Sequence, residues 1–210
     1  MRSDQELVRA WQGGDRKAGN ELLRRHFGAI HRFFANKVDH EIEELAQDTF
    51  VRCVEAYARY EGRSSFRTFL FGVANNVLRE WFRKKNRYQP IDFETQSVVD
   101  MGAGPSSILV GRREQRALLE ALRRIPVESQ VVLELYYWER MSGLQLGEIL
   151  EIPEPTAYSR VRRAKQLLKK SLARLQASPI VLQSTVTDLD GWAAQVRATL
   201  SANDGTPAPS

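Results

Sequence analysis

The chain of 210 residues is poor in the side chains that build disulfide or metal sites. It has one cysteine and three histidines, so a disulfide framework is excluded and no Cys/His spacing matches a zinc site. His26, His31 and His40 are scattered, and we interpret them as structural or surface residues. Cys53 falls in an apolar helical stripe, which predicts a buried hydrophobe, the alternative being a redox-sensing thiol.

Signatures of enzymes and of membrane proteins are absent as well. No glycine-rich loop could cradle a phosphate, and no Ser/His/Asp arrangement or carboxylate pair offers acid–base chemistry. We therefore expect no enzyme and no cofactor. No apolar run reaches the roughly 20 residues that span a bilayer, and the first residues, MRSDQELVRA, lack the apolar core of a signal peptide. These absences predict a cytoplasmic protein without a membrane partner.

Positive charge is present in modest excess. The net charge is +5, which favours a polyanionic partner without identifying one. Helical periodicity covers most of the chain but disappears over residues 88–111, which are rich in proline, glycine and serine. That composition predicts an extended interdomain linker. We thus predict an all-α protein with domains over residues 1–87 and 112–177, and a C-terminal extension over residues 178–210.

Capping signals delimit the first helices. Ser3 with Glu6 forms a capping box, Gly13-Gly14 ends that helix, and Asp15 caps the next one. Acidic residues after Asp39 favour a third helix start. Its side assigned to the core comprises Ile42, Leu45, Ala46, Thr49, Phe50, Cys53, Val54 and Tyr57. Its other side, either an ordinary solvated surface or a partner-docking face, comprises Gln47, Asp48, Val51, Arg52 and Glu55.

The segment FRTFLFGVANNVLREWFRKKNR, which begins at Phe66, is the clearest amphipathic helix. Its polar side is assigned to Arg67, Asn75, Asn76, Arg79, Arg83 and Lys84. Asparagine is disfavoured in helix interiors, so Asn75 and Asn76 require either hydrogen bonds inside the fold or a ligand outside it. The Ser-rich loop before the helix is flanked by Tyr60 and Phe66. Aromatic and cationic side chains there suit single-stranded nucleic acid, although the aromatic residues fit a core equally well.

The stretch from Ser142 to Lys170 has a helix-turn-helix pattern. Ser142 with Gln145 forms a capping box, Gly147 permits close helix contact, and two prolines suit the first turn of a second helix. The core side of that second helix is assigned to Ala157, Val161, Ala164 and Leu168. Its outer side comprises Glu154, Tyr158, Ser159, Arg162 and Arg163, and it could either enter a major groove or be a solvated basic face.

The extension after Ser178-Pro179 holds one short amphipathic segment. Thr187 can cap it, and its apolar side comprises Leu189, Trp192, Ala193, Val196 and Leu200. It packs on the second domain, contacts a partner, or has no role.

Five motifs in a fixed order carry a resemblance to a known family. They are ELLRRHFGAIHRFF, EELAQDTFVRCVEAY, YEGRSSFRTFLFGVANNVLREWFRKKNR, ALRRIPVESQVVLELYYWERMS and IPEPTAYSRVRRAKQLL. From about Leu7 to Leu175 the chain resembles bacterial sigma factors of the extracytoplasmic-function group, in the sigma-70 family. The resemblance implies a sigma-two domain, a sigma-four domain, and two partners, core RNA polymerase and promoter DNA. An anti-sigma factor is a further possible partner.

The resemblance also assigns roles to residues. Docking on the beta-prime coiled coil of polymerase is implied for Gln47, Asp48, Val51, Arg52 and Glu55. Binding and opening of the minus-ten element is implied for Arg63, Ser64, Ser65, Arg67, Asn75, Asn76, Arg79, Arg83 and Lys84. Reading of the minus-thirty-five element is implied for Glu154, Pro155, Thr156, Tyr158, Ser159, Arg160, Arg162 and Arg163. The beta flap of polymerase is a second expected docking site.

Glu151, Pro155 and Tyr158 depart from the family pattern. Glu151 stands where a glycine is common, and a left-handed glutamate costs about 1 kcal/mol, so we expect the turn to be remodelled. Tyr158 replaces a lysine and removes a phosphate or base contact. Two alternative functions remain open at this point: a stand-alone helix-turn-helix regulator, and an adaptor that binds polymerase or a sigma factor.

Overall fold

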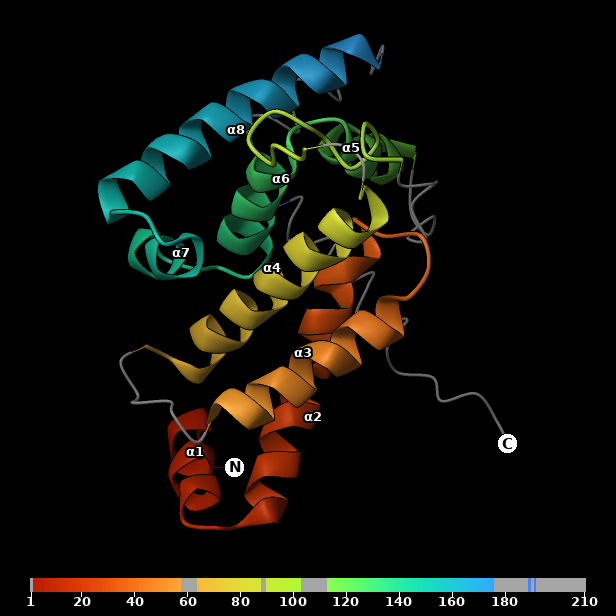
Figure 1. Cartoon of the computed structure of the whole chain (residues 1–210). Helices are drawn as coiled ribbons and strands as arrows, with labels where there is room; N and C mark the ends of the chain where they lie inside the picture. The colour runs from red at the N-terminus through yellow and green to blue at the C-terminus, as the bar shows by residue number, and fades with distance from the viewer. Residues whose placement is uncertain are drawn as a thin grey trace.

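The computed structural model describes residues 2–57, 64–87, 90–102 and 113–175, together with residues 189 and 191. The regular elements among these residues are helices, as the all-α prediction requires, and the only β pairing among them is an isolated bridge between Ser97 and Pro126. The helices (Figure 1) are α1 (Asp4–Gln12), α2 (Arg16–Ala35), α3 (Ile42–Tyr57), α4 (Phe66–Lys85), α5 (Arg113–Arg123), α6 (Val127–Leu133), the π-helix η1 (Glu134–Trp138), α7 (Gly143–Leu150) and α8 (Glu154–Arg174). No described helix is both long and apolar enough to cross a bilayer.

The predicted caps are confirmed. Ser3 and Glu6 form a capping box at the start of α1, and Gly13 caps its carboxyl end. At the start of α2, the Asp15 carboxylate accepts hydrogen bonds from two backbone N–H groups. Each of these bonds satisfies a backbone donor or acceptor that a helix end would otherwise leave unpaired. The first two helices therefore begin and end where local side-chain chemistry dictates.

The core of the first domain lies between α2, α3 and α4. Its buried apolar side chains include Leu22, Ile30, Phe33, Phe34, Leu45, Ala46, Cys53, Leu70, Phe71, Val77, Leu78 and Phe82. Cys53 is buried as predicted, and this burial raises the pKa of its thiol to about 12, so the thiolate is scarce at neutral pH.

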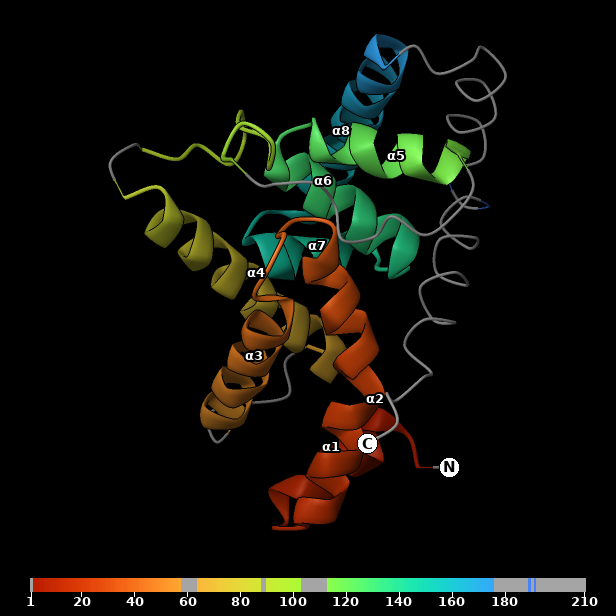
Figure 2. The same ribbon diagram turned by 90° about the vertical axis from the view of Figure 1, so that its right-hand side faces the viewer.

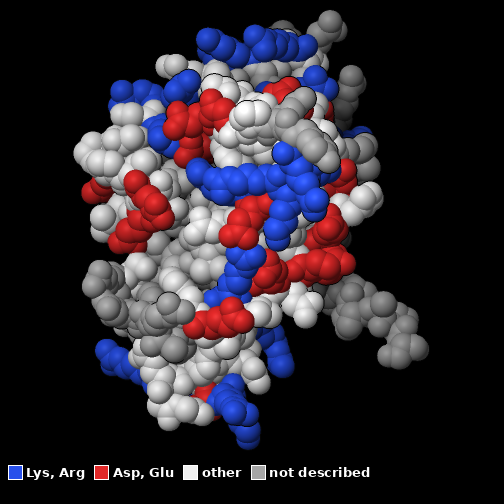
Figure 3. All heavy atoms as spheres, in the orientation of Figure 1, with Lys and Arg blue, Asp and Glu red and all other residues white. Residues whose placement is uncertain are grey.

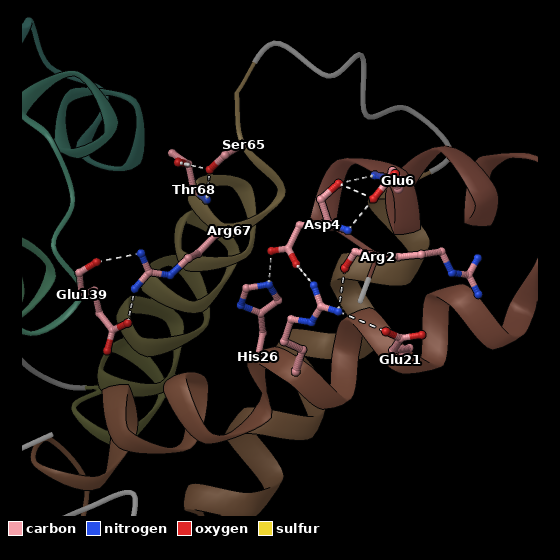
Figure 4. A network of polar contacts seen from close by, with 11 residues as sticks. Arg2, Asp4, Glu6, Glu21, His26, Ser65, Arg67, Thr68 and Glu139 are labelled. Carbon is pink, nitrogen blue, oxygen red and sulfur yellow. Dashed lines mark hydrogen bonds and ion pairs between the residues drawn. The ribbon is translucent and has the colours of Figure 1, made fainter. Parts of the chain in front are cut away.

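An ionic cluster ties α1 to α2 (Figure 4). The Asp4 carboxylate lies 2.7 Å from His26 Nε2 and accepts a 2.6 Å bond from Arg25. Burial opposes the charge on Asp4, but the bonds to His26 and Arg25 outweigh it and lower the pKa of the carboxyl. Burial also lowers the pKa of His26, more than Asp4 raises it. His26 is therefore a structural residue, one of the two roles expected for the histidines.

The second domain is formed by α5, α6 with η1, α7 and α8. Figures 1 and 2 show it above α1–α3, with α4 between the two groups. Helix α6 continues directly into the π-helical turn η1. The carbonyl of Glu134 accepts from the N–H of Glu139, a spacing of five residues. This turn places both glutamates where they meet the first domain.

Residues 90–102 of the predicted linker are folded rather than extended. Phe93, Val98 and Met101 are buried, and the backbone N–H of Val127 and of Glu128 donate to this segment. The composition predicted no periodic structure, and none forms. The segment nevertheless packs against both domains, because its apolar side chains are buried there and its carbonyl groups accept hydrogen bonds.

The two domains meet through a buried polar junction at the end of α2. The carbonyl of Asn36 accepts from Arg123 at 3.0 Å and from Gln130 at 3.2 Å. Lys37 is fully enclosed and pairs with Glu134 of η1. Burial lowers the pKa of Lys37 although the charge of Glu134 opposes this. Positive groups at the carboxyl end of α2 also complement its dipole.

Candidate functional site

The helix-turn-helix is observed with its turn intact. Glu151 ends α7 in the left-handed conformation, with φ 57° and ψ 43°, so the expected remodelling does not occur. The N–H of Ile152 donates to the carbonyl of Gly147 at 2.9 Å. A Cβ on Gly147 would lie 2.6 Å from the carbonyl oxygen of Ile152, so only glycine allows this close approach. The close contact predicted for Gly147 is confirmed.

The outer side of α8 carries the predicted reading residues. The exposed ones are Glu154, Pro155, Thr156, Tyr158, Ser159, Arg162 and Arg163. Arg160 is different, because its guanidinium is half-buried and pairs with Glu94 at 3.1 Å and with Glu128. The geometry of α8 suits insertion into a major groove, with one of its arginines engaged inside the protein.

Tyr158 has structural contacts of its own. A Cβ on Gly143 would lie 2.4 Å from the Tyr158 ring, and this ring meets that of Tyr136 edge-on with a centroid distance of 6.5 Å. The departure from lysine is thus accommodated by a glycine at the start of α7. The ring still has an exposed fraction of 43% and could contact DNA.

The surface of α4 brings together most of the residues predicted to bind the minus-ten element. Asn76, Arg83 and Lys84 are exposed, whereas Asn75 has an exposed fraction of only 4%. The assignment of Asn75 to the outer side of the helix was therefore wrong. Its burial favours the structural amide over the nucleic-acid contact.

Two arginines of α4 bond to the second domain. Arg67 donates to the backbone carbonyl of Glu139 at 2.7 Å and pairs with its carboxylate (Figure 4). Arg79 pairs with Glu128 at 3.1 Å, and its guanidinium lies over the ring of Phe93. These contacts link residues that are 72 and 49 positions apart in sequence.

The loop before α4 is described only in part. Ser65 is the N-cap of α4, because its hydroxyl accepts from the N–H of Thr68 at 3.0 Å. Ser64 is partly buried beside it, and Arg63 and Tyr60 lie outside the described residues. Ser65 therefore has a capping role, which leaves a DNA contact as a prediction.

An apolar hollow lies between α2 and α3, on the face predicted to dock a partner. It has a volume of about 700 Å³ and is lined by Leu23, Phe27, Glu43, Gln47, Phe50, Val51, Val54 and Glu55. Phe27, Val51 and Val54 have exposed fractions of 46%, 48% and 45%. Single exposed apolar residues are ordinary, but three around one hollow indicate a binding surface.

Sequence reasoning missed several residues of this hollow, among them its exposed apolar side chains Val54 and Phe27. Val54 was assigned to the core side of α3, yet it points outward, and Phe27 was assigned no role. Phe27 stacks on Phe50 with a centroid distance of 6.0 Å. A large exposed aromatic residue in a strongly amphipathic helix was the signal that could have found it. Of the polar residues predicted there, Arg52 pairs with Asp48 at 3.0 Å, and it also pairs with Glu80 of α4 at 2.8 Å.

Charge is unevenly distributed over the face shown in Figure 3. Lysine and arginine side chains lie along the upper edge, over α8, and again across the middle of this face, with carboxylates interspersed between them. No group of three or more acidic, histidine or cysteine side chains able to hold a metal occurs among the described residues.

Comparisons with known proteins match both halves of the chain. Residues 20–88 match the Sigma-70 region 2 family, and residues 115–168 match the Sigma-70, region 4 family. The ECF RNA polymerase sigma-E factor of Haemophilus influenzae is 24% identical over 82% of this chain and 97% of that protein. The RNA polymerase sigma-H factor of Pseudomonas aeruginosa is 25% identical over 82% of this chain and 95% of that protein.

A third relative and a solved structure agree. The ECF RNA polymerase sigma factor SigX of Bacillus subtilis is 26% identical over 69% of this chain and 77% of that protein. The fold is similar to that of CnrH in its complex with the cytosolic domain of CnrY, with a TM-score of 0.59, 20% identity, and coverage of 81% of this chain and 97% of that one. Two sigma-70 regions in order, on helical domains with a helix-turn-helix, show that the chain belongs to the extracytoplasmic-function group of the sigma-70 family and is a sigma factor.

Proposed function

We propose that the chain binds core RNA polymerase through the hollow between α2 and α3, and then recognises and opens promoters with α4 and α8. The observation that carries the docking step is the ring of exposed apolar side chains, Phe27, Val51 and Val54, around one hollow. Apolar surface of this kind gains about 25 cal/mol per Å² when a partner covers it. The partner surface proposed here is the beta-prime coiled coil, and the beta flap is proposed for the second domain.

The polar residues of the hollow determine which partner surface it can bind. Glu43, Gln47 and Glu55 of α3 are the polar residues that line it. A partner helix with basic residues around an apolar stripe would match this arrangement. Arg52 is held by Asp48 and Glu80, so it positions α3 against α4 as well as facing the partner.

Opening of the minus-ten element is proposed for the exposed part of α4 and the loop before it. Asn76, Arg83 and Lys84 are accessible, and the basic end of α4 suits a phosphate backbone. Each unpaired base that stacks on an aromatic side chain contributes about 1–3 kcal/mol. The energy needed to open a few base pairs can thus come from several such contacts in one domain.

Reading of the minus-thirty-five element is proposed for α8. Its exposed Arg162 and Arg163 can donate to guanine edges or to phosphates, and one good bidentate contact discriminates by about 1–3 kcal/mol. A few such contacts give each domain alone only weak affinity for promoter DNA. Polymerase supplies the missing affinity because it holds both domains at promoter spacing and raises their effective concentration.

An anti-sigma partner is proposed on the same hollow. The similar solved structure holds CnrH with the cytosolic domain of CnrY, which favours a protein partner for this chain also. A partner seated between α2 and α3 would exclude polymerase by direct competition.

Substitutions that place a negative charge in the hollow test the docking proposal. Val51→Glu and Phe27→Glu should each weaken binding to core polymerase by about tenfold or more, because a buried unpaired carboxylate is costly. Val99→Glu is the matched control, since Val99 is exposed elsewhere. Binding is measured by fluorescence anisotropy of labelled chain titrated with core enzyme. Equal affinities for all three variants and the unchanged chain would contradict the assigned surface.

A further inference from the structure

The first helix, α1, carries none of the residues assigned to DNA or to polymerase. It is nevertheless packed firmly into the first domain, because Leu7 is fully buried and Trp11 is half-buried. Side chains at both of its ends contact α2, and the contacts made at each end lead to the same residue, Phe66, which begins α4.

The amino end of α1 is joined to α2 by Asp4 (Figure 4). Its carboxylate lies 2.7 Å from His26 Nε2 and accepts from Arg25 at 2.6 Å. Arg25 also donates to the carbonyl of Arg2 at 3.0 Å. The His26 ring, which these contacts orient, lies against the ring of Phe66 with a centroid distance of 5.7 Å. The amino end of α1 is thus connected to Phe66 through one imidazole.

The carboxyl half of α1 reaches the same phenyl ring through Trp11. The indole meets Phe66 edge-on with a centroid distance of 6.4 Å. A Cβ on Gly19 of α2 would lie 2.7 Å from the indole, so glycine at this position is what allows Trp11 to lie so close to α2. Phe66 is therefore enclosed by one ring from α1 and one from α2, and it is buried.

Phe66 directly follows the segment proposed to open DNA. The hydroxyl of Ser65 accepts from the N–H of Thr68, and its carbonyl accepts from the N–H of Phe69, both at 3.0 Å. These bonds fix the backbone within one turn, but they do not fix that turn relative to the rest of the first domain. Of its neighbours in that turn, Arg67 bonds to the second domain. The Phe66 ring is therefore an anchor of this turn within its own domain.

The position of this turn matters for one step of the proposed function more than for the others. A segment that captures unpaired bases binds them more tightly when it is already ordered, because ordering it costs conformational entropy. Opening of the duplex depends on that capture. Docking through the hollow between α2 and α3, and reading by α8, use surfaces that do not include Phe66.

We propose that α1 is a brace for promoter opening, in which Trp11 and Asp4, acting through Phe66 and His26, position the start of α4 and the DNA-opening segment before it. Trp11 and Asp4 are positioning residues in this proposal and contact no DNA. The inference rests on the proposed function, because it takes the start of α4 to be part of the DNA-opening surface. A helix that only completed the core would affect every step alike, through stability.

The first measurement is hydrogen exchange in the free chain, followed by mass spectrometry over the peptide of residues 64–70. Trp11→Ala should speed exchange in this peptide by about tenfold or more, because the N–H groups of Thr68 and Phe69 lose protection when the first turn of α4 opens. Exchange in α8 should stay unchanged. Asp4→Asn keeps the size of the side chain but removes its charge, and it should give a smaller effect in the same peptide.

Three further variants separate positioning from loss of stability. Arg9→Ala changes an exposed side chain of α1 and should leave exchange unchanged. Val38→Ala removes two buried methyl groups beyond the other end of α2, so it should lower the unfolding midpoint without a selective change over residues 64–70. Trp11→Phe keeps an aromatic ring beside Phe66 and should restore most of the protection.

The second measurement uses the holoenzyme and a promoter selected from a library by the unchanged chain. Transcription from the duplex promoter is compared with transcription from the same promoter already unpaired by mismatches over the minus-ten element. Trp11→Ala should lower the transcript from the duplex by about tenfold and that from the unpaired template by about twofold or less, because mismatches remove the cost of separating the strands. Its affinity for core polymerase should be unchanged, and Val38→Ala should affect the two templates equally.

Each result bears on the brace in a distinct way. Unchanged exchange over residues 64–70 in both Trp11→Ala and Asp4→Asn would overturn it, whatever transcription shows. Equal losses from the duplex and the unpaired template would overturn its role in opening. If Trp11→Ala does not fold, Asp4→Asn serves in both measurements with the same expected directions. Absence of specific transcripts from the unchanged chain on both templates would refute the proposed function, whereas faster exchange in Trp11→Ala would leave the brace standing.

Discussion

Lys37 and Glu134 form an ion pair enclosed between the two domains, although 97 positions separate them in the sequence. The Lys37 side chain has no exposed surface and that of Glu134 retains 12%. A buried pair of this kind does not by itself guarantee stability, because desolvation of both charges opposes their attraction. Removal of one partner alone is costly, since it leaves the other charged group uncompensated.

Substitution of Lys37 tests whether this junction couples the domains. Lys37→Met should lower the free energy of unfolding by about 3–5 kcal/mol, because Glu134 loses its ion-pair partner in a nearly buried site. The double variant Lys37→Met/Glu134→Gln should recover much of that loss. Urea unfolding followed by circular dichroism measures Lys37→Met, Glu134→Gln and the double variant. A loss in the double variant equal to the sum of the two single losses would show that the pair is not coupled.

Glu151 stores backbone strain in the helix-turn-helix. Glu151→Gly should raise the free energy of unfolding by about 1 kcal/mol, because glycine adopts a φ of 57° without a Cβ clash. Glu148→Gly is the control within α7, where the same change should destabilise by about 1 kcal/mol. Thermal unfolding of the three proteins gives the comparison. A destabilised Glu151→Gly would mean that the glutamate side chain contributes contacts that outweigh its strain.

The buried His26 predicts a loss of stability on acidification. Burial lowers its pKa in the folded state, so below the ordinary value of about 6.5 the unfolded chain binds a proton that the folded chain resists. The stability contributed by neutral His26 is complete above that pH and declines as the pH falls, by at most about 1.4 kcal/mol per unit. Asp4 loses its own contribution only in stronger acid, because its folded pKa is lowered from 3.8.

Unfolding midpoints between about pH 7.5 and 5.5 test this prediction. His26→Gln keeps a hydrogen-bonding group near Asp4 and should flatten the pH dependence, whereas His40→Gln, at an exposed position, should leave it as it is. The charged neighbours of His26 are Asp4, Arg25 and Arg67. Identical slopes in the unchanged chain and in His26→Gln would exclude His26 as the cause.

Local signals in the sequence were sufficient to predict the helices. The capping residues Ser3, Asp15 and Ser142 each lie at an observed helix start, and the apolar stripe of α8 faces the core as expected. These features depend on residues within one or two turns of each other, so a single sequence reveals them.

Contacts between the domains could not be predicted in the same way. Arg67 and Glu139, or Arg79 and Glu128, are joined by packing of whole domains, and no spacing rule links residues so far apart. The polar side of α4 was therefore assigned to DNA without its internal partners. Asn75 and Val54 were misplaced because each lies near the edge of its helical stripe, where a small rotation of the helix decides burial.

The central claim is that the chain directs polymerase to promoters with two domains acting together. Run-off transcription with core polymerase on a promoter library tests it most directly, and truncation after Ala177 in the same assay tests the C-terminal extension. The account predicts start-site-specific transcripts that fall about tenfold or more in Arg162→Glu/Arg163→Glu, since two reversed charges on α8 repel phosphates. The control Arg16→Glu/Lys17→Glu, at exposed positions on α2, should retain transcription. The absence of specific transcripts on every template, or full activity of the α8 variant, would contradict the account.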